Sequence, residues 1–545
     1  MVGRGADLPL GYVGLGLDCD GQWVGDLREG IHETDKDFYL IEKRDGELLG
    51  AHVCQARLGG EMRGDDLGKL VGYSSRIAVG ELGDKRFCAD HGIKYAYMLG
   101  AMANGIASVE LVEAAGRGGM LGSYGAAGQS LGVIGEAIDR LKAGGYPFCV
   151  NLIHSPSEPR HEAGVVDLLL EKDVRLIEAS AYLDLNYEVV RYRLSGIYRD
   201  ESGAVVTPHE IIAKVSRVEV ARKWFSPAPM KHVKRLLAEG LIDGDQAEMS
   251  AEVPMAYDLT AEADSGGHTD NRPFITLLPT MLALRDELFK AFGYRRGLRV
   301  GVGGGISTPS SAAGAFMMGG DYIVTGSVNQ CCVESGSSDV VRGMLAGTGQ
   351  ADVTMAPAAD MFEMGVKLQV LKRGTMFAMR ANKLFELYRA YGGLDEIPLK
   401  DRLSIEKTIF RCGLDEIWEL TRAFFLAREP SQVAKAEGDE KHRMALVFRW
   451  YLGLSSRWAN DGKAGREADY QIWAGPAMGA FNQWVKGSYL EGWENRGVVG
   501  VGREILYGAT IVLRLGILRS QGVNLLGDWI DVLPVGEERL RRIFG

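Results

Sequence analysis

A histidine directly after two glycines is the residue of this chain whose surroundings most favour chemistry. The strand-like run Tyr257–Ala261 comes shortly before it, so His268 would project from the carboxyl end of a strand, where β/α enzymes keep their reactive groups. Gly266 and Gly267 would let the backbone approach a flat ligand without a Cβ atom. An imidazole there can donate a proton or polarise a carbonyl. We predict that His268 is catalytic; the alternative is a structural histidine.

Two glycine-rich turns follow the last two strand-like runs. The first precedes a helix that Pro309 would begin, because proline favours the first helical turn. Free N–H groups at a helix N-terminus bind phosphate. A tight turn without a ligand is the alternative for each, but the pair has the order and spacing of phosphate-binding turns in a (β/α)₈ barrel. We predict a single phosphate, that of FMN, held by Gly303, Gly304, Gly305, Gly326 and Ser327.

Four further residues are predicted to contact the flavin ring. Ala101 and Met102 follow the first strand-like run, and such a loop leaves room for a flat ring system. Asn151 ends the third, and its amide can donate and accept at a ring edge; an Asx turn is the alternative. Lys214 lies on the fifth, where a buried cation needs a partner, either a flavin N1–C2=O edge or a carboxylate.

The composition excludes several classes of protein. The 545 residues carry a net charge of −10, so nothing indicates nucleic acid or an anionic membrane as a partner. Seven cysteines without a CxxC pair are typical of a reducing compartment, and we expect a cytoplasmic protein. The spacing of His154, His161 and Glu162 fits no common metal site, so no metal is predicted there, and solvent exposure is expected for them.

Eight short apolar runs alternate with helical stretches between residues 92 and 330. Their number and spacing predict a (β/α)₈ TIM barrel. A doubly wound open sheet is less favoured, because the glycine turns follow late strands and not the first one. The expected strands are Tyr95–Leu99, Gly119–Ser123, Phe148–Ile153, Leu176–Ala179, Ile211–Val215, Tyr257–Ala261, Arg299–Val302 and Tyr322–Thr325.

Three domains are predicted around this pattern. Residues 1–80 form a small β-rich appendage, with a hairpin at Asp45-Gly46. Residues 81–335 form the barrel, which is interrupted by a hairpin within Arg191–Val206 and by an apolar helix at Ile275–Phe292. Residues 336–545 form a mostly helical region, with a helix over Met361–Tyr391 and an exposed loop at Glu429–Lys441.

The motifs resemble those of a known flavin-barrel family. Met98 to Gly105, Val150 to Pro156 and Gly301 to Ser307 are similar to segments of nitronate monooxygenases and flavin-type enoyl-[acyl-carrier-protein] reductases. The run Asp264 to Pro273 and the segment Val370 to Met376 resemble the stand-alone, trans-acting enoyl reductases of polyunsaturated fatty-acid and polyketide synthases. The glycine turns alone are not specific for this family, whereas the run from Asp264 to Pro273 is.

This resemblance implies a TIM barrel that binds FMN and is reduced by NADPH. The substrate would be an enoyl thioester on an acyl carrier protein, and His268 would match the histidine of the family's Gly-Gly-His motif. The family also suggests a homodimer. Two alternatives stay open: a nitronate monooxygenase-type flavin oxidase on the same barrel, and a non-catalytic protein that docks carrier domains.

Overall fold

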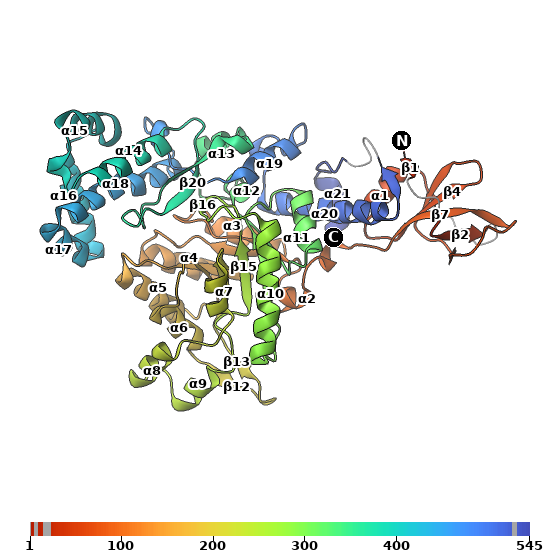
Figure 1. Cartoon of the computed structure of the whole chain (residues 1–545), viewed down its shortest axis with the longest axis horizontal. Coiled ribbons are helices and arrows are strands. Elements are labelled where there is room, and N and C mark those ends of the chain that lie inside the picture. Colours follow the sequence, from red (N-terminus) through yellow and green to blue (C-terminus); the bar gives the residue numbers. More distant parts are fainter. Residues whose placement is uncertain (1, 5–8, 15–22, 526–530) are drawn as a thin grey trace.

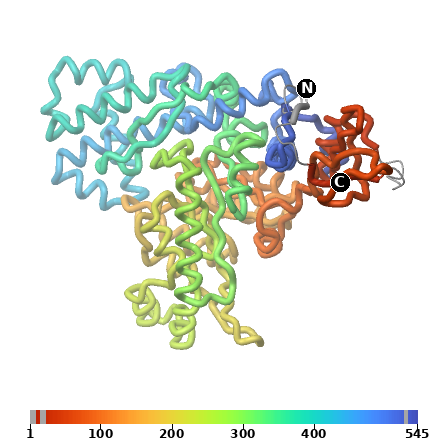
Figure 2. The backbone as a smooth tube through the Cα atoms, turned by 45° about the vertical axis from the view of Figure 1, so that its right-hand side comes forward, coloured from red at the N-terminus to blue at the C-terminus, as the bar shows by residue number. Residues whose placement is uncertain are grey.

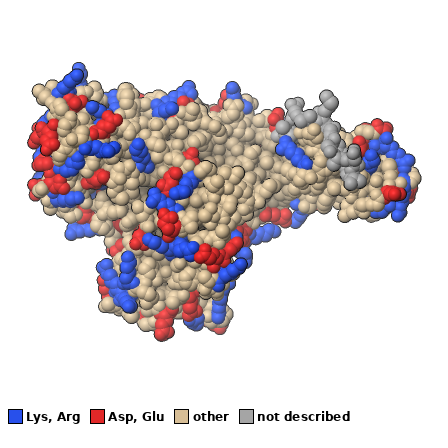
Figure 3. Space-filling model, in the orientation of Figure 1, with Lys and Arg blue, Asp and Glu red and all other residues tan. Residues whose placement is uncertain are grey.

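The computed structural model of the chain describes residues 2–4, 9–14, 23–525 and 531–545. It contains a β-rich N-terminal part, a central barrel and a helical lobe, which lie side by side along the long axis (Figures 1 and 2). Among the described residues, no helix is both long and apolar enough to cross a membrane. Figure 3 shows basic and acidic side chains interspersed over the helical lobe and the outer helices of the barrel on this face.

A closed barrel of eight parallel strands forms the centre, as predicted. Each strand pairs with the next along the chain, and β18 closes the barrel on β8. The apolar runs form strands because both faces of each strand are covered: β11, for example, is buried along its whole length. The strands are β8 (Tyr97–Leu99), β9 (Leu121–Tyr124), β10 (Phe148–Ile153), β11 (Leu176–Ser180), β14 (Glu210–Val215), β15 (Asp258–Glu262), β17 (Arg299–Gly303) and β18 (Ile323–Thr325).

Helices surround the barrel on the outside. α4 shows how the local sequence sets its limits: Ser130 accepts a hydrogen bond from the N–H of Val133, and Gly145 ends the helix at a φ of 68°. The predicted apolar helix between the sixth and seventh strands is α10. The outer helices include α3 (Val109–Arg117), α4 (Leu131–Gly144), α5 (Pro159–Glu171), α6 (Tyr187–Leu194), α7 (Val218–Trp224), α10 (Phe274–Phe292) and α11 (Pro309–Met317).

The N-terminal part is a six-stranded sheet that stands beside the barrel (Figure 1). The predicted hairpin is confirmed: β4 (Phe38–Lys43) pairs with β5 (Leu48–Ala51), and Gly46 adopts a φ of 87° in the turn. The long helix α20 (Val498–Ser520) joins the parts, because it packs on α11 of the barrel and on β7 (Asp66–Ser74) of the sheet. Its buried Arg514 donates hydrogen bonds to backbone oxygens of the N-terminal part.

The helical lobe has a hydrophobic core of its own. Buried side chains of all its long helices meet there, including Leu384, Ile417, Phe448 and Tyr451. The lobe consists of α14 (Phe377–Ala390), α15 (Leu399–Ile405), α16 (Leu414–Arg428), α17 (Pro430–Gly438) and α18 (Glu440–Asn460). The helical character of the C-terminal region is therefore confirmed, whereas the boundaries at about residues 80 and 335 stay a prediction.

Two local predictions in the region after the barrel need correction. The helix predicted over Met361–Tyr391 is wrong in its first half, where Lys367–Leu371 form strand β20. Gly365 and Gly374, at φ of 71° and 77°, interrupt helical geometry on either side of this strand. The loop predicted at Glu429–Lys441 is wrong, because most of this segment forms helix α17. Pro430 begins the helix, and its apolar side chains Val433 and Ala436 are buried. The hairpin predicted within Arg191–Val206 is confirmed: β12 (Tyr198–Arg199) pairs with β13 (Val205–Val206), and residues 191–194 complete α6.

Candidate functional site

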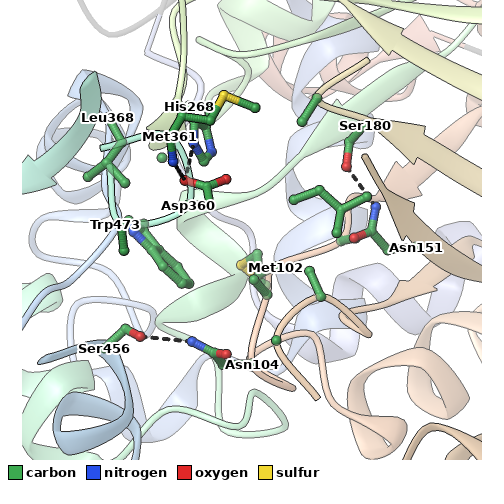
Figure 4. Close-up of a pocket in the computed structure, with 18 of the residues that line it drawn as sticks. Met102, Asn104, Asn151, Ser180, His268, Asp360, Met361, Leu368, Ser456 and Trp473 are labelled. Atoms are coloured by element: carbon green, nitrogen blue, oxygen red, sulfur yellow. Dashed lines mark hydrogen bonds and ion pairs between the residues drawn. The ribbon is translucent and has the colours of Figure 1, made fainter. Parts of the chain in front are cut away.

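A cavity of about 630 Å³ lies at the carboxyl ends of the barrel strands and extends beneath the helical lobe. Its lining includes every residue to which the sequence assigned a role in catalysis or cofactor binding. These residues are Ala101, Met102, Asn151, Lys214, Gly266, Gly267, His268, Gly303, Gly304, Gly305, Gly326 and Ser327. Figure 4 shows that His268 and Asn151 reach this cavity from different elements.

The two glycine turns form a cradle at one end of the cavity. Gly304 and Gly305 have φ of 83° and 75°, and a Cβ on Gly304 would lie 2.6 Å from the backbone of Ala263. A Cβ on Gly326, by contrast, would meet no protein atom within 4 Å. In the described part of the chain, the N–H groups of Gly304, Gly305 and Gly326 donate to no protein acceptor. Free N–H groups beside open space fit the terminal phosphate of FMN.

His268 is held by a small sheet outside the barrel. It belongs to β16 (Gly267–His268), which pairs with β20, and β20 in turn pairs with β19 (Val353–Pro357). Gly266 packs against Ala474, where a Cβ would lie 2.9 Å from that backbone. Gln369 donates to the backbone oxygen of Ser265 at 2.9 Å. The position of His268 therefore depends on segments that follow the barrel in the chain.

The imidazole of His268 is paired with a carboxylate. Its Nε2 lies 3.1 Å from Oδ1 of Asp360, and that oxygen also accepts from the N–H of Met361 at 3.1 Å. Both pairs are drawn in Figure 4. Burial alone would lower the pKa of His268, but the charge and hydrogen bond of Asp360 outweigh burial and raise this pKa above its usual value. His268 is thus suited to carry a proton near neutral pH.

A second ion pair lies deeper at the strand ends. Nζ of Lys214 lies 3.1 Å from Oε1 of Glu262, and the charges of Glu262 and Glu178 raise the pKa of this lysine despite the opposing effect of its burial. Of the two partners considered for Lys214, the carboxylate is therefore present, and a contact with a flavin stays a prediction. The buried Glu178 accepts from the N–H of Ala101 at 2.8 Å, and its Oε1 has no hydrogen-bond partner among the described residues.

Asn151 is fixed in orientation by the neighbouring strand. Its amide nitrogen donates to the backbone oxygen of Glu178 at 3.0 Å and to Oγ of Ser180 at 2.9 Å (Figure 4). The Asx turn considered as an alternative is wrong, because Asn151 lies inside β10 and its amide oxygen accepts no hydrogen bond from the described backbone. Since both N–H groups are used, only the amide oxygen remains for a ligand, as an acceptor.

The sequence missed several residues that line the cavity. Asp360 belonged to no recognisable motif and directly precedes the segment that was predicted to be helical. Glu178 looked like one polar residue in an apolar strand, although a buried carboxylate at a strand end was a usable signal. The expected exposure was wrong for Glu162, which is buried in α5: it accepts from Tyr182 at 2.9 Å, and its other oxygen pairs with the partly exposed His154 at 3.1 Å.

The fold and site define a TIM-barrel protein with two glycine turns and a histidine at the strand ends. Comparison with solved structures finds the enoyl reductase domain of MlnA from the macrolactin biosynthesis cluster of Bacillus amyloliquefaciens, 40% identical, with a TM-score of 0.76. The match covers 81% of this chain and 99% of that domain. The chain therefore belongs to the family of this enoyl reductase domain.

Longer synthase proteins are also similar to the chain. One of the polyunsaturated fatty acid synthase proteins of Thraustochytrium sp. is 48% identical over 81% of this chain, and polyketide biosynthesis protein PksE of Bacillus subtilis is 43% identical over 80%. The chain spans 30% and 57% of the lengths of these two relatives. Residues 391–470 match the model of the inserted helical domain of [acyl-carrier-protein] S-malonyltransferase.

Proposed function

We propose that the chain is an FMN- and NADPH-dependent enoyl reductase that acts on thioesters of acyl carrier protein domains in polyunsaturated fatty-acid or polyketide synthesis. The observation that carries this proposal is one cavity that contains both the glycine cradle and the His268–Asp360 pair. The likeness to an enoyl reductase domain and to synthase proteins supports the reaction and its setting.

The cavity offers suitable groups for each part of FMN. Gly304, Gly305 and Gly326, with Ser327, would bind the phosphate through backbone N–H groups. Asn151 would accept a hydrogen bond from the ring, and Lys214 would contribute positive charge at a ring edge. When bound, the flavin supplies hydride transfer, in which NADPH is the source and the β-carbon of the enoyl thioester is the acceptor.

His268 has the position and charge to complete the reduction at the α-carbon. Hydride addition at the β-carbon leaves negative charge on the thioester oxygen and the α-carbon, and a protonated imidazole stabilises that charge and then donates the proton. Asp360 holds the ring through Nε2 and keeps its pKa raised, so the protonated form is available near neutral pH. The cavity wall from the helical lobe would exclude water from this step.

The region that follows the barrel would shape the channel for the acyl-pantetheine arm. Residues of α16 and α18 line the cavity, together with Met361 and Leu368 from the segment around β20. Arg428 of α16 pairs with Glu158 of the barrel at 2.8 Å, which holds the lobe over the strand ends. The lobe would thus cover the site, which suits a substrate larger than a small nitronate.

The visible spectrum of the purified protein, followed by mass analysis of the released cofactor, tests the cofactor. Bound or reconstitutable FMN is expected; a colourless protein that cannot be reconstituted would favour the non-catalytic docking protein. Turnover of crotonyl-pantetheine with NADPH then tests the reaction. Oxidation of nitronate by oxygen, without enoyl reduction, would instead indicate a flavin oxidase.

A further inference from the structure

An apolar stripe on α16 lines the part of the cavity that the helical lobe encloses. Leu420 and Phe424 line this cavity, and their side chains are 50% and 44% exposed. They lie four residues apart and so share one face of the helix. Trp418 and Phe425 pack into the core of the lobe and fix the helix. The stripe is thus a rigid apolar surface that is partly exposed within the cavity.

The same cavity offers further apolar surface. Leu183, from the loop after β11, lines the same cavity and is 47% exposed. The hydroxyl of Thr421 donates to the backbone oxygen of Ile417 at 2.7 Å, so it is not free for a ligand. Single exposed apolar side chains are ordinary on protein surfaces, but several that line one cavity are typical of a site for an apolar ligand.

The stripe is held in place relative to the barrel. Arg428, at the end of α16, pairs with Glu158, and Gln432 donates to the backbone oxygen of Ser157 at 2.9 Å. Both bonds join the lobe to the loop that precedes α5. Because the same cavity contains His268, a ligand whose reactive end lies at that histidine can extend to the stripe without leaving the cavity.

We propose that Leu420 and Phe424 bind the distal, apolar part of a long acyl chain whose thioester end lies at His268. This inference rests on the proposed function and adds the substrate class: long, apolar acyl chains are bound better than short ones. A short chain gains nothing from the stripe because it ends near the reacting carbons. Each further methylene that reaches the stripe leaves water and improves binding.

Steady-state kinetics of the FMN-loaded enzyme with two substrates tests this inference. Crotonyl-pantetheine is the short chain and decenoyl-pantetheine the long one. In Phe424→Ala and Leu420→Ala, kcat/KM for decenoyl-pantetheine should fall about tenfold, whereas crotonyl turnover and the KM for NADPH should stay within about twofold. Leu426→Ala is the matched control: Leu426 is 45% exposed on the same helix, about 200° around from Phe424 and outside the cavity lining of the described residues.

Calorimetry gives a readout that needs no turnover. Decanoyl-pantetheine should bind the Phe424→Ala holoenzyme about tenfold more weakly than the unchanged enzyme, and butyryl-pantetheine should bind both alike. Equal losses for both chain lengths, or no loss for either, would overturn the acyl-chain site while leaving enoyl reduction in place. A raised KM for NADPH alone would assign the stripe to the nucleotide instead. If the unchanged enzyme reduces neither thioester, the proposed function fails and this inference with it.

Discussion

Nε2 of His268 and Oδ1 of Asp360 lie 3.1 Å apart although 92 residues separate them in the chain. His268 comes from the strand end of the barrel, and Asp360 comes from the segment between β19 and β20. The pairing of β16 with β20 brings the two segments together. The barrel therefore supplies the glycine turns and the histidine, whereas the raised pKa of the histidine depends on the region that follows the barrel.

Replacement of His268 should separate the two half-reactions. His268→Ala is expected to keep FMN and to be reduced by NADPH at the unchanged rate, because neither step needs this side chain. Enoyl reduction should fall roughly 10²–10⁴-fold, the range for one acid–base group. Stopped-flow absorbance measures the first step, and mass spectrometry of the thioester measures the second. Reoxidation by enoyl substrate at the unchanged rate would make His268 a structural residue.

Asp360→Asn should shift the pH dependence of enoyl reduction. Asp360 raises the pKa of His268, so its loss lowers that pKa and the protonated imidazole disappears at a lower pH. The alkaline limb of the kcat/KM profile should therefore move to lower pH, while the rate of flavin reduction keeps its own profile. A fall in activity by the same factor at every pH would show that Asp360 acts only through local structure.

Gly326→Ala should weaken FMN binding without harming the fold. A Cβ at this position meets no protein atom within 4 Å, so it would project into the space proposed for the phosphate. We expect the Kd for FMN to rise at least about tenfold, or about 1.4 kcal/mol. Gly132→Ala is the control, since its Cβ also meets nothing but lies outside the cavity lining. Fluorescence titration of the apoprotein measures both; equal affinities would place the phosphate elsewhere.

A buried ion pair at the opposite end of the barrel should control acid stability. Asp258 accepts from Arg299, and from His91 at 2.9 Å, and their charges hold its pKa well below the usual range although burial opposes this. Its contribution is present above the unfolded-state pKa of about 3.9 and is lost as the pH falls toward the folded-state value. Asp258→Asn should reduce the free energy of unfolding by about 3–5 kcal/mol at neutral pH. Urea unfolding at several pH values checks this; an unchanged midpoint would contradict it.

The barrel could be predicted from the sequence because each strand is a local apolar run bounded by glycine or polar residues. That the candidate cofactor residues would line one cavity could be predicted as well, since strand ends in such a barrel converge on one face; their contact with a cofactor stays a prediction. Asp360 and the apolar stripe of α16 could not be predicted, because their roles arise from contacts between distant segments. The false helix over Met361–Tyr391 shows the reason: Lys367–Leu371 is a strand only because it pairs with β16 and β19.

Anaerobic mixing of the NADPH-reduced enzyme with crotonyl-pantetheine tests the central claim most directly. The flavin absorbance band should return in a single turnover, and butyryl-pantetheine should form in equal amount to the flavin reoxidised. A flavin that stays reduced with the thioester, yet reoxidises when oxygen is admitted, would contradict enoyl reduction as the function of this chain.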